Sequence, residues 1–114
     1  MRGFVALADA TLDATAAGQA LNLGAVPEGK KLVACVQVIG VADPADTVQV
    51  VIEGDAADDF SGDETQHITF DALSANGAQF VELQGPLADT WFRARADVAG
   101  VSPSFNVIVT IGIV

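Results

Sequence analysis

Apolar and polar residues alternate along most of this chain, so that every second side chain belongs to the same class. The clearest example is the C-terminal quarter, residues 90–114, where two alternating segments flank a short connection. The apolar positions are Phe92, Ala94, Ala96 and Val98 in the first segment, and Phe105, Val107, Val109, Ile111 and Ile113 in the second. A period of two residues is typical of a strand with one buried face. Because Gly100 and Pro103 interrupt the pattern, we expect a β-hairpin that closes the domain.

The same alternation predicts shorter strands throughout the rest of the chain. They are expected at residues 4–10, 19–23, 30–41, 47–53, 66–71 and 79–84. The Asn76-Gly77 pair is a strong two-residue turn signal, and we expect it to join the last two of these strands. About eight short strands without helical periodicity predict an all-β protein, an antiparallel two-sheet sandwich that is jelly-roll-like. An immunoglobulin-like sandwich is the alternative.

The segment 30–41 is apolar on both faces apart from Gln37. Such a strand lies in the middle of a sheet that is covered twice, or has one face closed by another subunit. With 114 residues, the chain is expected to form one domain, 1–114. Residues 1–18 are expected either to fold with the sandwich or to extend as an N-terminal arm.

The net negative charge of the chain makes some kinds of binding partner unlikely. The chain has 15 acidic and 5 basic residues, a formal net charge of −10, while 51% of its residues are hydrophobic. Because nucleic-acid affinity comes mainly from basic side chains on phosphates, we expect no nucleic-acid partner and no anionic membrane surface. The longest apolar run, 105–114, is about half as long as a transmembrane helix, so no transmembrane helix is expected. The apolar excess suggests surface covered by a partner.

Catalytic chemistry finds little support. The chain has one histidine, His67, and no tyrosine. His67 and Asp71 lie four residues apart on a predicted strand, about 13 Å at ~3.3 Å per residue, so we expect His67 to be a polar residue on an exposed face. Cys35 is the single cysteine and lies in an apolar run, which favours a small core residue. We expect no enzyme, no catalytic residue and no cofactor.

An acidic loop, 54–64, is the best metal candidate. Its oxygen ligands are of the kind that Ca²⁺ prefers, and the candidates are Asp55, Asp58, Asp59, Asp63 and Glu64. Their spacing does not match the calcium-loop frame, so a solvated acidic loop is the default interpretation. Phe60 is the one large apolar residue in the loop, and we expect it to tuck beneath it.

A second group of candidates lies on the strand 91–98. Trp91, Arg93 and Arg95 share one face of it. They are interpreted either as cross-strand partners of carboxylates such as Glu82, or as a protein contact patch, because tryptophan and arginine are enriched at interface hot spots.

Three segments of the C-terminal two-thirds resemble small virion proteins of tailed bacteriophages. They are DTVQVVIEG at Asp46–Gly54, LQGPL at Leu83–Leu87 and FRARADVAGVSPSFNV at Phe92–Val107. The relatives often carry a D-G-x-x-W segment in the central loop, where this chain has Asp59-Phe60-Ser61-Gly62. This departure leaves open which virion role the chain plays.

The resemblance implies a structural protein of the head decoration or cement type. Such a protein is made in the host cytoplasm, binds the major capsid protein on the capsid exterior and stabilises the shell. Binding at symmetry axes implies a homo-oligomer, a dimer or trimer. The alternative is a tail, neck or vertex component, or a host-surface module with Trp91 and the acidic loop as a glycan or Ca²⁺ site.

Overall fold

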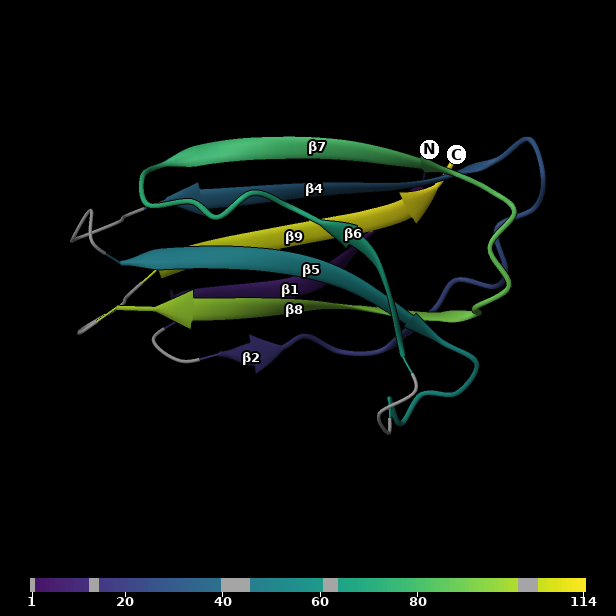
Figure 1. Cartoon of the computed structure of the whole chain (residues 1–114), viewed down its shortest axis with the longest axis horizontal. Coiled ribbons are helices and arrows are strands. Elements are labelled where there is room, and N and C mark those ends of the chain that lie inside the picture. The colour runs from purple at the N-terminus through teal and green to yellow at the C-terminus, as the bar shows by residue number, and fades with distance from the viewer. Residues whose placement is uncertain (1, 13–14, 40–45, 61–63, 101–104) are drawn as a thin grey trace.

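A computed structural model describes residues 2–12, 15–39, 46–60, 64–100 and 105–114. These residues form nine strands (Figure 1): β1 (Arg2–Leu12), β2 (Ala16–Ala17), β3 (Leu21–Asn22), β4 (Lys31–Ile39), β5 (Thr47–Asp55), β6 (Thr65–Thr69), β7 (Gly77–Gln84), β8 (Trp91–Ala99) and β9 (Phe105–Ile113). Within the described ranges there is no helix, and hence no helical segment that could cross a membrane.

The strands form two antiparallel sheets that face each other. Sheet A has the order β1-β9-β4-β7, and sheet B has the order β2-β8-β5-β6, with β3 also paired to β8. Figure 1 shows the strands of both sheets running along the long axis of the molecule. The all-β, two-sheet sandwich predicted from the alternation is therefore confirmed.

The pairing identifies the sandwich as a jelly roll. The first strand pairs with the last (β1 with β9), β2 and β3 pair with β8, β4 pairs with β7, and β5 pairs with β6. If β2 and β3 are counted as one interrupted strand, eight strands form four nested antiparallel pairs, as in a long hairpin rolled onto itself. An immunoglobulin-like sandwich groups its strands as ABED and CFG, which differs from this order.

The two predicted hairpins are wrong, although their strands are right. β8 lies in sheet B and β9 in sheet A, and β6 and β7 are likewise divided between the sheets. β8 pairs with β5 along nine positions, from Thr47↔Ala99 to Asp55↔Trp91. The chain therefore changes sheet between β6 and β7, and again between β8 and β9. The apolar faces of β8 and β9 meet across the core instead of lying in one sheet.

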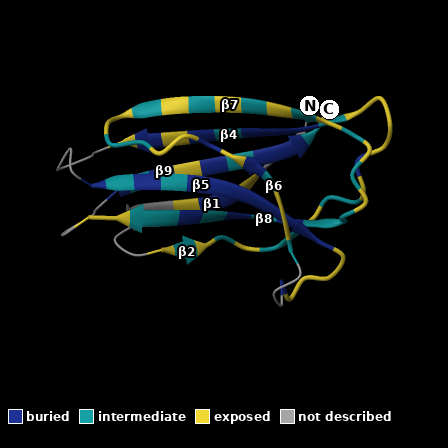
Figure 2. Cartoon of the chain, in the orientation of Figure 1, coloured by how far each residue is buried: buried dark blue, intermediate teal, exposed yellow. Residues whose placement is uncertain are grey.

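The core consists of the inner faces predicted from the alternation. Phe92, Ala94 and Ala96 on β8 are fully buried, as are Val107 and Val109 on β9. Leu32, Ile52 and Ile111 fill the space between them and are at most 1% exposed. Figure 2 shows buried residues running through β4, β5, β8 and β9.

β1 departs from strict alternation. Ala6 and Leu7 are both buried, while Val5 and Ala8 are exposed. The register of β1 against β9 shifts between Val5 and Leu7, which is the signature of a β-bulge. At the bulge, a Cβ atom on Gly18 would collide with the carbonyl oxygen of Ala6, so glycine permits this close approach. β1 thus pairs along the length of β9 as an edge strand of sheet A.

Candidate functional site

The outer face of sheet A is the first candidate site. The register of the four strands aligns Val5, Thr110, Cys35 and Phe80 in one row across it. The next rows contain Ala8, Ile108, Gln37 and Ala78 on one side, and Gly112, Val33 and Glu82 on the other. We call this surface the apolar face.

The apolar face carries the exposed large hydrophobic side chains of the described residues. Val5 is 51% exposed, Ile39 45%, Phe80 57%, Ile108 38% and Val114, which follows β9 directly, 48%. These fractions are high for side chains of this size on a soluble domain, where isolated apolar residues are common but clusters are not.

Charge is nearly excluded from the same surface. The strands β4, β7 and β9 contain one basic and one acidic residue, Lys31 and Glu82. These two form an ion pair of 2.8 Å between Lys31 Nζ and Glu82 Oε2. The chain as a whole has a net charge of −10. The part of the apolar face formed by these three strands has a net charge of zero and therefore differs from the rest of the protein.

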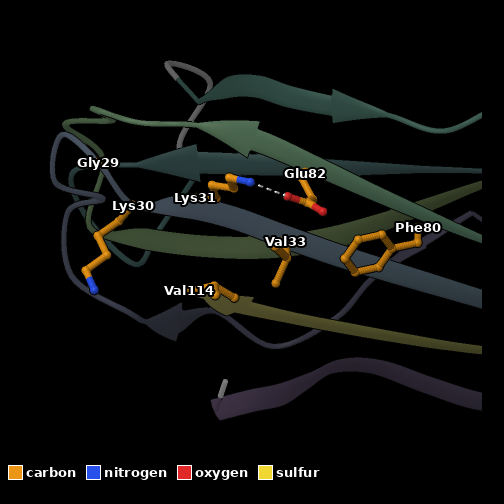
Figure 3. Close-up of a pocket in the computed structure, with 7 residues that line it drawn as sticks. All are labelled: Gly29, Lys30, Lys31, Val33, Phe80, Glu82 and Val114. Carbon is orange, nitrogen blue, oxygen red and sulfur yellow. Dashed lines mark hydrogen bonds and ion pairs between the residues drawn. The ribbon is translucent and has the colours of Figure 1, made fainter.

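A hollow of about 460 Å³ lies at one end of the apolar face. Figure 3 shows its lining, where the Lys31 amino group points to the Glu82 carboxylate, Val33 and Phe80 lie beside this pair, and Lys30 points away. Its lining combines three apolar side chains, Val33, Phe80 and Val114, with Gly29, Lys30 and the Lys31–Glu82 ion pair.

Cys35 lies on the apolar face and is half-buried. The prediction that it is a core residue is wrong, because the inner face of β4 is formed by its neighbours Ala34 and Val36, which are 1% exposed. Since β4 is apolar on both faces, the sequence alone could not decide which face was inside. β4 lies between β9 and β7 inside sheet A, and the apolar residues of its outer face are Val33, Cys35 and Ile39.

The outer face of sheet B carries an ionic cluster, formed by Glu53, Arg93, Arg95 and Asp97. Glu53 accepts from Arg93 Nε at 2.9 Å and from Arg95 Nη1 at 2.7 Å, and Arg95 also donates to Asp97 at 3.0 Å. The Glu53 side chain is 1% exposed, while the two arginines are 22% and 26% exposed. The two positive and two negative charges cancel, so this cluster stabilises the sheet surface without adding net charge.

Phe60 packs against Arg93, one of the four residues of the cluster. The guanidinium carbon of Arg93 lies 4.4 Å from the centre of the Phe60 ring, a cation–π contact. Phe60 is 7% exposed and has a positive φ of 44°. The prediction that it anchors the acidic loop is confirmed, and the surface that it packs on is the ionic cluster.

The sequence pointed to the wrong partner for the arginines. Glu82 lies on the other sheet and pairs with Lys31, whereas Glu53 was not recognised as a partner. One sequence feature could have identified it, since Glu53 is an acidic residue at an outward position of the apolar strand 47–53. Trp91, the third contact candidate, is half-buried and lies opposite Asp55 in the register.

The calcium candidates do not assemble. Asp55 is 5% exposed, and its Oδ1 accepts from the Ala56 amide at 2.6 Å while its Oδ2 has no hydrogen-bond partner. Asp58 and Asp59 are exposed, Glu64 is half-buried, and Asp63 lies outside the described residues. In the part of the chain that the structure describes, no three acidic, histidine or cysteine side chains gather as a metal site would require.

His67 is not on an exposed face, and this prediction is wrong. Its side chain is 11% exposed, its Nε2 lies 2.7 Å from Asp89 Oδ2, and its ring centre lies 5.9 Å from that of Phe92. The register between β5 and β6 shifts between Ile52 and Glu53, which turns the histidine from the outer face toward the interior. These contacts tie β6 to the segment before β8.

Gly54→Ala is expected to break the contact between His67 and Asp89. A Cβ on Gly54 would lie 2.7 Å from both His67 Nε2 and Asp89 Oδ2, so both side chains would have to move and lose their hydrogen bond. We expect the free energy of unfolding to fall by about 1–3 kcal/mol, measured by urea denaturation. Gly77→Ala is the control, since its Cβ would meet nothing nearer than 3.9 Å. Equal losses in the two variants would contradict this explanation.

The two outer faces therefore differ in kind. Sheet B carries an ion-paired cluster with Phe60 packed on its Arg93, and sheet A presents apolar side chains to its surroundings. The second arrangement suits binding to another apolar surface. A comparison of the sequence with protein-family models and with curated proteins found no match.

Proposed function

We propose that this protein is a structural component of a larger assembly, which it joins through the apolar face. The observation that carries the proposal is the gathering of Val5, Ile39, Phe80 and Ile108 on one side of sheet A. Exposed apolar clusters of this kind mark contact sites on soluble proteins. The remaining surface, with its acidic loop and net negative charge, keeps the free chain soluble.

We further propose that the assembly is the head of a tailed bacteriophage and that the chain is a decoration protein on its exterior. Support comes from the resemblance of the segments 46–54, 83–87 and 92–107 to phage virion proteins. Jelly rolls recur among viral capsid proteins, although a fold does not by itself decide a function. In this arrangement the apolar face is covered by a neighbouring subunit on the shell, and other surfaces of the chain contact the major capsid protein, the principal partner.

Deleting the protein from the particle tests this role. Heads that lack it are expected to release their DNA at a lower temperature than complete heads, and adding the purified chain should restore the release temperature of complete heads. Many weak contacts repeated over the shell produce such an effect. The copy number per particle should be on the order of hundreds, as for a subunit that follows the symmetry of the shell.

Unchanged thermal release together with a copy number of about a dozen would contradict a head role. It would favour a tail, neck or vertex component, since these structures contain few copies of each subunit.

A further inference from the structure

We infer that the apolar face packs against the same face of a second copy of this chain, so that two jelly rolls form a dimer with sheet A of each molecule inside. The inference rests on the proposed function in one respect, that the apolar face is a contact face. It adds that the molecule in contact with this face is a second copy of the same chain.

The area of the face is large enough for a stable dimer. Sheet A has four strands, and three of them have eight or nine residues. With strands about 4.8 Å apart and a rise of about 3.3 Å per residue, the face measures roughly 19 by 30 Å. Two such faces bury about 1,100 Å² before side-chain relief is added, just above the roughly 1,000 Å² that a biological interface should exceed.

Charge favours the same arrangement. Each copy carries a net charge of −10, so two copies repel each other wherever their acidic surfaces approach. In β4, β7 and β9 the charged residues are Lys31 and Glu82, which already neutralise each other. The part of the apolar face formed by β4, β7 and β9 is thus a surface on which two identical acidic chains can meet without bringing uncompensated charges together.

The order of large and small side chains across the face also favours packing against a second copy. One row runs from Val5 on β1 through Thr110 and Cys35 to Phe80 on β7, with the most exposed side chains at its two ends. A two-fold axis in the interface, parallel to the strands, sets β7 of one copy over β1 of the other. Phe80 then lies over Val5 of the second copy at both edges, with the smaller side chains between, at the ~10 Å spacing of packed sheets.

Sedimentation equilibrium of the full chain tests the inference. The wild-type chain, 11.6 kDa as a monomer, should have twice this mass at a concentration of about 100 μM, as expected for a dissociation constant in the micromolar range. Phe80→Lys should raise the dimer dissociation constant by about tenfold or more, because it places an unpaired charge in the interface. Ile108→Lys should act in the same way.

The lysine variants distinguish the loss of apolar contacts in the dimer from electrostatic repulsion between the two copies. Both reduce the negative charge of the chain, so they weaken long-range repulsion between copies, and only burial of the apolar face explains dissociation. Gln66→Lys, on the exposed part of β6 in sheet B, adds the same charge elsewhere and should leave the dimer intact. Far-UV circular dichroism checks that each variant is folded.

A wild-type chain that stays monomeric at about 100 μM, or a dimer that persists in both folded lysine variants, would overturn the inference. The outcome is independent of the head role. A monomer that still binds phage heads refutes only the dimer, and a dimer that fails to bind them refutes only the proposed function.

Discussion

Glu53→Ala is expected to lower the free energy of unfolding by about 3–5 kcal/mol, the usual cost of removing one partner of a buried ion pair. The Glu53 carboxylate is 1% exposed and accepts from both Arg93 and Arg95. Without it, two guanidinium groups that are about three-quarters buried remain close together, with Asp97 as the remaining carboxylate of the cluster. Their mutual repulsion then acts in a partly dehydrated environment.

Urea denaturation followed by tryptophan fluorescence measures this effect, since Trp91 lies on the same strand as both arginines. Glu82→Ala is the matched control. Its ion pair with Lys31 is 40–45% exposed, and exposed pairs contribute at most about 1 kcal/mol. If the two variants lose equal stability, the ionic cluster does not have the structural role assigned to it.

Phe92→Ala is expected to cost about 3–5 kcal/mol, whereas Phe80→Ala should cost less than about 1 kcal/mol. Phe92 is fully buried in the core and lies against His67, while Phe80 is 57% exposed on the apolar face. The same substitution thus removes a large buried contact area on one strand and a mostly solvated side chain on another.

Both variants should be measured at a chain concentration of about 1 μM, because association of copies adds stability that depends on concentration. The difference in unfolding free energy is the quantity to compare. A similar cost for both phenylalanines would mean that the outer face of β7 is covered within the single chain, and it would remove the basis for a contact face there.

Alternation predicted which side chains point inward, and it did so most reliably for strands with one polar face. On β8, Phe92 and Ala94 are buried while Arg93 is not, as the pattern requires. The reason is steric, since successive side chains of a strand point to opposite faces whatever the fold. β4 offered no such contrast, and for that reason Cys35 was placed on the wrong side.

Pairing could not be predicted in the same way. A short connection between two strands can close a hairpin within one sheet or carry the chain to the opposite sheet, and the local pattern is the same in both cases. The Asn76-Gly77 turn and the segment around Gly100 were both interpreted as hairpins, and both join different sheets. The nested order of the jelly roll depends on contacts between residues far apart in the sequence, such as β1 with β9.

The same limit applies to the candidate sites. Glu53 and the arginines lie 40 and 42 residues apart in the chain, and their contact follows from the β5–β8 register, which alternation does not supply. His67 was misplaced because a register shift in β6 reverses its direction. Phe60 was predicted well, because a single large apolar residue in an acidic loop has few alternatives to burial.

The central claim, that the apolar face is covered in the assembled state, is tested most directly by the reactivity of Cys35. This residue lies in the middle row of the face, is half-buried in the single chain and is the one cysteine in the sequence. We expect iodoacetamide to modify it at least about tenfold more slowly in purified particles than in the free wild-type chain diluted to about 1 μM, because a covered thiol is reached only during dissociation. Equal modification rates in the particle and in the diluted free chain would contradict the claim.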